Sequence, residues 1–214
     1  MKSKRILIFT GGDLSPRLLD EIKKDDYIIG ADRGALFLIE NGIKPHASVG
    51  DFDSISAEQL EQVAALSGKM VECDPVDKDL TDTELAFDLA IERTPEEIML
   101  LGGTGTRMDH TLANIHMLLR GVQHHIRCSM LDSYNYITLT GTSCTVEDRG
   151  FTYVSLLPLT PEVTGIELEG FEYPLHNATL KIGQSLGISN RLSGSKGTVK
   201  IEGGLLLIIQ SKDR

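Results

Sequence analysis

The feature of this sequence that most constrains its fold is a change of pattern close to residue 130. Before this point, short apolar runs alternate with segments of helical spacing; after it, short β-type runs follow one another, separated by glycine, proline and asparagine. Strands that alternate with helices predict a parallel sheet with helices on both faces, whereas consecutive short strands predict an antiparallel sandwich or barrel. We therefore predict an α/β, doubly wound and mainly parallel domain over residues 1–132, then an all-β, sandwich-like domain over residues 133–214.

The elements of the first domain are predicted from apolar runs and capping signals. Ser56 with Gln59, and Thr81 with Glu84, have the spacing of a capping box and so predict two helix starts. Gly121 is expected to end the last helix. The other predicted elements are strands at residues 6–9, 27–29, 70–73 and 98–101, a strand ending at residue 49, and helical segments at residues 18–22, 36–40 and 111–120.

The second domain is expected to consist of short strands joined by turns. The predicted strands are residues 136–139, 153–157, 163–168, 178–182, 198–201 and 205–209. Between the last two runs, Glu202-Gly203-Gly204 is typical of a hairpin turn.

Composition excludes some classes of function. The formal net charge is −10, which disfavours nucleic acid as a partner because phosphate backbones are bound by basic surfaces. No run approaches the roughly 18 apolar residues that a membrane helix needs, and the apolar run near the start is too short for a signal peptide. We therefore expect a cytoplasmic protein with no membrane partner. The 3 cysteines form no C-x-x-C pair and are expected to be small buried apolar residues.

Residues suited to chemistry cluster after the predicted strands of the first domain. In an open parallel sheet, ligands bind beyond the carboxyl ends of the strands, so the loops that follow them are expected to gather at one edge. Glycine and aspartate also serve turns and helix caps, so each loop alone has a structural explanation, but together they favour a site. The loops are Gly11-Gly12-Asp13, Ala31-Asp32-Arg33-Gly34, Gly50-Asp51-Phe52-Asp53-Ser54, Asp74 through Asp82, and Gly102-Gly103-Thr104-Gly105-Thr106-Arg107-Met108-Asp109.

The sharpest feature is the pair Asp51 and Asp53. Alternate residues of an extended segment point the same way, so the two carboxylates are expected to share one cation. Hard oxygen ligands of this kind suit Mg²⁺, which binds one or two carboxylates together with substrate phosphates and water. Asp82 is expected in the first turn of the helix capped by Thr81, where it serves the helix start, faces this pair, or does both.

The segment 102–105 is glycine-rich and can place backbone N–H groups around a phosphate. The P-loop pattern is absent, and Met108 stands where a dinucleotide fingerprint begun at Gly103 would need its last glycine. Arg107 adds a planar fork suited to phosphate oxygens. Asp109, directly before the predicted helix, fits either a helix N-cap or a site residue.

Short motifs occur along this chain in an order and spacing that resemble a known family. They are A-D-R-G (31–34), G-D-F-D-S (50–54), D-K-D-x-T-D-T-E (77–84), G-G-x-x-x-R-x-D-H (102–110) and a late G-I-S-N (187–190). Together they resemble the thiamine pyrophosphokinases over nearly the whole chain. The resemblance implies an α/β catalytic domain, a following β domain, and the reaction ATP + thiamine → AMP + thiamine diphosphate.

The resemblance also implies roles for residues of the first domain. In this family Mg²⁺ is bound by aspartates that match Asp51, Asp53 and Asp82, with the Asp32 position nearby. Asp109 is expected close to where thiamine and ATP meet. The residues expected to bind ATP are Asp32, Arg33, Gly102, Gly103, Thr104 and Arg107.

For the β domain, the resemblance implies that Ser189 and Asn190 help to bind thiamine. Enzymes like this are homodimers, with thiamine bound between the subunits. Eukaryotic relatives use a tryptophan near the thiamine rings, and this chain has no tryptophan.

The mechanism that the resemblance implies is attack of the thiamine hydroxyl on the β-phosphorus of ATP, with AMP as the leaving group. Metal clamping and in-line positioning are expected to supply most of the catalysis. Asp109 or Asp82 is expected to accept the hydroxyl proton, and the sequence does not decide between them. Two alternatives stay open: a Mg²⁺-dependent nucleotide phosphohydrolase, and a non-catalytic sensor of a nucleotide and a small molecule.

Overall fold

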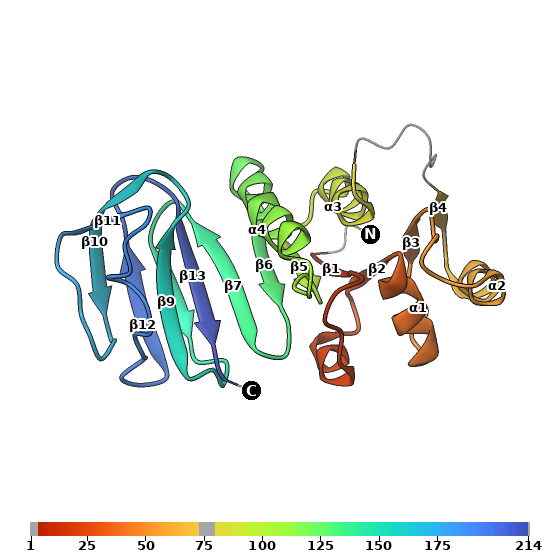
Figure 1. Ribbon diagram of the computed structural model, residues 1–214, viewed down its shortest axis with the longest axis horizontal. Helices are drawn as coiled ribbons and strands as arrows, with labels where there is room; N and C mark the ends of the chain where they lie inside the picture. Colours follow the sequence, from red (N-terminus) through yellow and green to blue (C-terminus); the bar gives the residue numbers. More distant parts are fainter. Residues whose placement is uncertain (1–3, 73–79, 214) are drawn as a thin grey trace. The chain divides into compact units, whose positions relative to one another are not determined.

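The computed structural model describes residues 4–72 and 80–213 of the chain. They form two compact units, Met1–Ser133 and Tyr134–Arg214, each with its own arrangement of strands (Figure 1). The boundary lies one residue after the predicted one. Cys73 and the acidic residues Asp74, Asp77 and Asp79 lie outside the described residues. Within the described part, no helix combines the length and apolar character needed to cross a membrane.

The first unit is built on a parallel sheet with the strand order β4-β3-β2-β1-β5-β6. Its helices α1 and α2 lie on one face of this sheet and α3 and α4 on the other (Figure 1). The elements are β1 (Arg5–Phe9), the 3-10 helix η1 (Pro16–Glu21), β2 (Tyr27–Ala31), α1 (Arg33–Glu40), β3 (Ala47–Gly50), α2 (Ala57–Leu66), β4 (Met70–Glu72), α3 (Asp82–Glu92), β5 (Glu97–Leu101), α4 (Met108–Gln123) and β6 (Arg127–Leu131).

This arrangement confirms the predicted doubly wound fold. The central strands are apolar on both faces, and Ile6 through Phe9 of β1 are fully buried. The chain runs outward from β1 to β4 and then returns to β5 on the other side of β1. Strand order therefore reverses between β1 and β5, and the crevice beyond the carboxyl ends of these strands is where such sheets bind ligands.

The helix starts follow the predicted caps with one exception. Ser56 and Gln59 form the full capping box of α2, and the Thr81 side chain caps α3 by accepting a hydrogen bond from the Glu84 N–H. The start and end predicted for α4 are wrong: the helix begins at Met108 and contains Gly121. A Cβ at Gly121 would stand 2.2 Å from Cys128 Sγ, so this glycine lets β6 pack against the helix.

The second unit is a sandwich of two antiparallel sheets, ordered β7-β13-β9 and β11-β10-β12-β8. The core between them draws on both sheets, including Leu156 and Ile208 from one and Leu168 and Val199 from the other. The strands are β7 (Asn135–Thr140), β8 (Cys144–Glu147), β9 (Tyr153–Pro158), β10 (Glu162–Glu169), β11 (Ala178–Lys181), β12 (Lys196–Lys200) and β13 (Leu206–Ser211).

Two strands were not predicted, and one predicted hairpin is wrong. The strands β6 and β8 are short and interrupt their apolar residues with serine, threonine or charged side chains, so neither has a clear strand pattern. The segment at Gly203 does not join a pair of neighbouring strands, because β12 pairs with β10 and β8 while β13 pairs with β7 and β9. It carries the chain from one sheet of the sandwich to the other.

Candidate active site

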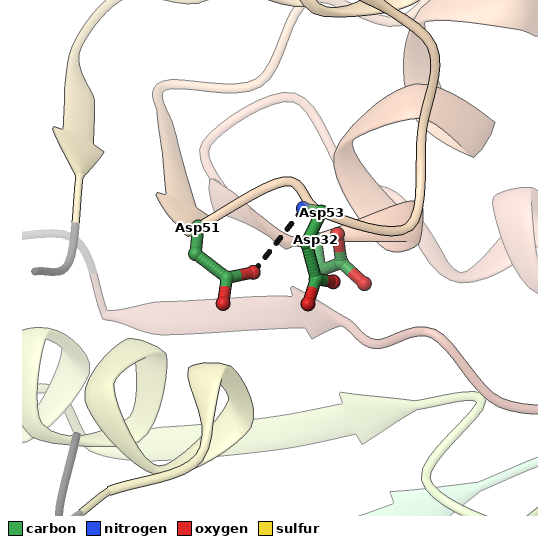
Figure 2. Close-up of side chains that lie close together, drawn as sticks. All are labelled: Asp32, Asp51 and Asp53. Carbon is green, nitrogen blue, oxygen red and sulfur yellow. Dashed lines mark hydrogen bonds between the residues drawn. The ribbon is translucent and has the colours of Figure 1, made fainter. Parts of the chain in front are cut away.

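Three carboxylates meet at the carboxyl edge of the parallel sheet. Asp32 follows β2, and Asp51 and Asp53 follow β3; each offers an oxygen within 4.8 Å of those of the other two. Figure 2 shows the three side chains extending to the same side of the loop that follows β3. The expected meeting of Asp51 with Asp53 therefore occurs, and Asp32 completes the cluster.

The reason given above for the meeting of Asp51 and Asp53 is wrong. The segment is a turn rather than an extended strand, because Phe52 has a φ of +56°. The Phe52 ring is buried and packs with Ala35 and Val63, while the N–H of Asp53 donates to Oδ1 of Asp51 at 3.3 Å. An aspartate that accepts a hydrogen bond two residues onward forms an Asx turn, and this turn brings the two carboxylates together.

Asp32 also has an unusual backbone, with a φ of +48°. It occupies the N-cap position of α1 but makes no side-chain capping bond there. Its two carboxylate oxygens instead accept hydrogen bonds from the Ser54 hydroxyl, at 2.9 and 2.7 Å. Backbone with a positive φ therefore occurs at one member of the cluster, Asp32, and at Phe52 between the other two, and such strain is found at functional sites.

Asp82 lies close to this cluster but is not one of the three residues within 4.8 Å of one another. It is the first residue of α3, and its Cγ lies 3.4 Å from where a Cβ on Gly50 would stand. Its Oδ1 is buried from solvent. Asp82 thus stands beside the residue that precedes Asp51, at the same edge of the sheet.

The glycine-rich loop lies at the crevice between β1 and β5. It is held in place by hydrogen bonds that its carbonyl oxygens accept. The carbonyl of Gly102 accepts from the Thr10 hydroxyl at 2.5 Å, and that of Gly103 from Asn114 Nδ2 at 2.7 Å. The carbonyl of Thr104 accepts from the Asp13 N–H at 2.7 Å. In a trans peptide the following N–H points the opposite way, so the N–H groups of Gly103 and Thr104 point away from these anchors.

Arg107 and Asp109, at the start of α4, form an ion pair with each other. Arg107 Nη2 lies 2.6 Å from Asp109 Oδ2, and both side chains are about two-thirds exposed, at 68% and 65%. The interpretation of Asp109 as an N-cap is wrong, because Arg107 occupies the N-cap position. The guanidinium and the His110 N–H lower the pKa of Asp109 to about 2.

In the second unit, Ser189 and Asn190 differ in what they can offer a ligand. Ser189 is exposed and has a φ of +59°, with its N–H bonded to Ser155 Oγ. Asn190 is buried, and its amide holds Tyr173 by accepting from the Tyr173 N–H and donating to the Tyr173 carbonyl. Asn190 therefore shapes the loop on which Ser189 lies.

Sequence reasoning missed the polar residues behind the glycine-rich loop. Thr10, Asn114 and Asp132 are buried, and each is within hydrogen-bond reach of this loop. Buried polar side chains in a parallel α/β unit are uncommon, but only the fold reveals that these three come to one loop.

Comparison with known proteins places these observations in a family. Residues 18–130 match the thiamin pyrophosphokinase catalytic domain, and residues 143–206 match the thiamin pyrophosphokinase vitamin B1 binding domain. The chain is 35% identical over 214 residues to the thiamine pyrophosphokinase of Bacillus subtilis, covering 98% of this chain and 100% of the relative. It is 27% identical over 176 residues to thiamin pyrophosphokinase 1 of Caenorhabditis elegans, covering 78% and 70%.

Solved structures agree over almost the full length. The crystal structure of the Bacillus subtilis thiamine pyrophosphokinase has a TM-score of 0.92 at 35% identity, covering 99% of this chain and 100% of that one. That of the Geobacillus thermodenitrificans thiamin pyrophosphokinase has a TM-score of 0.87 at 35% identity, covering 98% of each chain. The yeast thiamin pyrophosphokinase shares the fold, with a TM-score of 0.80 at 16% identity, covering 99% and 87%.

A doubly wound α/β unit with a polar carboxyl edge, followed by a β-sandwich unit, is here the architecture of an ATP-dependent diphosphotransferase. The chain belongs to the thiamine pyrophosphokinase family. Enzymes of this family transfer the diphosphoryl group of ATP to the hydroxyl of thiamine, which yields thiamine diphosphate and AMP.

Proposed function

We propose that this chain makes thiamine diphosphate with a Mg²⁺ ion held at the cluster of Asp32, Asp51 and Asp53, with Asp82 beside it. The observation that carries the proposal is the mutual approach of the three carboxylates at the edge where such sheets bind ligands. The cluster lies in the unit that matches the catalytic domain of the family.

The donor chemistry of this cluster fits Mg²⁺. The ion prefers hard oxygen ligands at about 2.1 Å, so two oxygens bound to one ion lie at most about 4 Å apart. Each of the three carboxylates offers an oxygen within 4.8 Å of those of the other two, which is close to this separation. When bound, the metal would neutralise charge on the phosphate oxygens that develops during transfer. Ser54 would keep Asp32 oriented, and the buried ring of Phe52 would keep Asp51 and Asp53 on one side of their turn.

The nucleotide phosphates are assigned to the glycine-rich loop. Its carbonyls are held by the protein, which leaves the N–H groups of Gly103 and Thr104 directed away from their anchors. Arg107 is exposed, and its planar guanidinium can donate two hydrogen bonds to phosphate oxygens. Arg33 lies next to Gly11, with its Cβ 3.6 Å from where a Cβ on Gly11 would stand, and so can reach the same crevice.

The ion pair of Arg107 with Asp109 bears on the proton transfer. A carboxylate with a pKa of about 2 stays ionised at neutral pH but is a weak proton acceptor. We propose that ATP phosphates compete for Arg107 and so release Asp109 toward the thiamine hydroxyl. Asp82 remains the alternative acceptor if it does not bind the metal.

Thiamine binding is assigned to the second unit, which matches the vitamin B1 binding domain. Ser189 is the side chain proposed to contact thiamine, because it is exposed and held in a fixed turn. Asn190 is proposed to act by shaping that turn, since both ends of its amide are engaged with Tyr173.

We also propose a cytoplasmic homodimer with the site at the subunit interface, as the family resemblance implies. Exposed apolar side chains support an interface on α4: Met108 and Leu112, one turn apart, are 61% and 49% exposed. Analytical ultracentrifugation tests the dimer; a monomer at catalytic concentrations would contradict it.

Product analysis tests the proposed activity. Purified protein with ATP, thiamine and Mg²⁺ is expected to form thiamine diphosphate and AMP in equal amounts, and chelation of the metal is expected to stop both. AMP or ADP released without thiamine would instead indicate a nucleotide phosphohydrolase. Calorimetric binding of both ligands with no product would indicate a sensor.

A further inference from the structure

Asp132 is a buried carboxylate that the mechanism above does not use. It follows β6 directly, at the carboxyl edge of the sheet, and is only 3% exposed. The hydroxyl of Thr104 donates a hydrogen bond to its Oδ2 at 2.6 Å. Burial of a carboxylate is costly unless it is well hydrogen-bonded. A buried aspartate at the carboxyl edge of the sheet is therefore a candidate for a functional role.

Thr104 is held from a second side by the loop after β1. Its carbonyl accepts from the Asp13 N–H at 2.7 Å, and a Cβ on Gly12 would stand 2.1 Å from this carbonyl oxygen. The two backbones therefore pack directly on one another. The loops after β1 and β6 are also joined by a hydrogen bond of 3.0 Å between the hydroxyls of Ser133 and Ser15.

Thr104 thus lies between two loops, with its hydroxyl bound to one and its carbonyl to the other. These two bonds fix the rotation of the residue about its backbone, and with it the direction of the N–H groups on either side. A hydrogen bond to an ionised acceptor is about twice as strong as a neutral one. The bond from the Thr104 hydroxyl to Asp132 is therefore stronger than the bond from the Asp13 N–H to the Thr104 carbonyl.

We infer that Asp132 is a positioning residue for ATP: through Thr104 it sets the glycine-rich loop in the conformation that receives the nucleotide phosphates. The inference rests on the proposed binding of ATP at this loop. Asp132 acts through its hydrogen bond to Thr104 and does not itself touch the substrate.

Steady-state kinetics with ATP and thiamine varied separately test the inference. Thr104→Val and Asp132→Ala are each expected to raise the ATP KM roughly tenfold, because each removes a hydrogen bond to a charged acceptor. The thiamine KM is expected to change less than about twofold. The double variant is expected to be no worse than Asp132→Ala alone, because the bond between Thr104 and Asp132 is already absent in that single variant.

Conservative variants and a matched control separate positioning from folding. Thr104→Ser and Asp132→Asn keep a donor and an acceptor, and are expected to recover most of the ATP affinity. Ser129→Ala removes a hydroxyl of β6 that is buried and has no hydrogen-bond partner among the described residues. This control is expected to leave the ATP KM unchanged. Urea unfolding of each variant identifies any that is not folded.

Two outcomes would overturn the inference: additive effects in the double variant, or an Asp132→Asn variant as impaired as Asp132→Ala. Arg107→Ala tests the proposed ATP placement separately. If it raises the ATP KM while Thr104→Val and Asp132→Ala do not, only the positioning role fails. If none of the three variants changes the ATP KM, the placement of ATP at this loop fails and the inference fails with it.

Discussion

The backbone N–H of Asp53 donates a hydrogen bond to Oδ1 of Asp51, across a residue whose ring lies in the core. That residue, Phe52, is 4% exposed and has a φ of +56°. A bulky side chain rarely adopts this backbone conformation, so burial of the ring must stabilise it. The separation of the two carboxylates is therefore set by packing between α1 and α2, at a distance from the chemistry.

Removal of the Phe52 ring should disturb both stability and metal use. Phe52→Ala is expected to lower the free energy of unfolding by about 3 kcal/mol or more. It is also expected to raise the Mg²⁺ concentration for half-maximal activity, because the turn is no longer anchored. Leu180→Ala, in the core of the other unit, should cost comparable stability and leave the Mg²⁺ dependence unchanged. An unaltered Mg²⁺ dependence in Phe52→Ala would contradict this account.

Much of the fold is predictable because its local signals agree. The parallel sheet, the capped starts of α2 and α3, and the change to a β unit all follow from periodicity and capping residues. The strands β6 and β8 escape prediction because their burial depends on neighbours that are distant in sequence. Gly121 looks like a helix end, yet it is a point of close contact with Cys128.

The candidate site is predictable only in part, for a related reason. Loops that follow parallel strands gather at one edge of the sheet, so the loop that carries Asp51 and Asp53 can be placed from sequence. The conformation of Phe52 and the bond between Thr104 and Asp132 depend on tertiary packing. No local pattern encodes contacts between residues that far apart in the chain.

The pKa of Asp109 should depend on Arg107. The guanidinium contributes most to holding this pKa at about 2, below the ordinary value of 3.8. The depressed pKa means that any stabilisation from the pair is present above about pH 4 and is lost as the pH falls toward 2. In Arg107→Ala, carboxyl ¹³C NMR is expected to show the Asp109 pKa rising toward 3.8. A titration unchanged from wild type would show that the pair does not form in solution.

Protonation of His46 should destabilise the fold. Burial and the nearby Arg93 lower the pKa of His46 below 6.5, and its Nδ1 accepts a hydrogen bond from the Ile28 N–H. Because the folded-state pKa is depressed, this stability is fully present above about pH 6.5 and is lost as the pH falls through the folded-state pKa. Urea unfolding between pH 8 and 5 measures the loss. His46→Gln should weaken this dependence, and a dependence identical to wild type would contradict the assignment.

Cys128 should be unreactive in the folded protein. Burial raises the pKa of its thiol to about 12, so almost no thiolate is present at pH 8. Mass spectrometry after brief iodoacetamide treatment is expected to find Cys128 unmodified in the native protein and modified in urea. Equal rates of modification in the two conditions would mean that β6 does not pack against α4 as described.

The central claim is that the carboxylates of Asp51 and Asp53 hold the metal that diphosphoryl transfer needs. The most direct test is kcat at saturating Mg²⁺ for Asp51→Asn and Asp53→Asn, beside Glu61→Gln, which neutralises an exposed carboxylate of α2. Both aspartate variants are expected to lose roughly 100-fold or more of kcat while unfolding like wild type, with Glu61→Gln unaffected. A kcat within a few-fold of wild type in either aspartate variant would contradict the account.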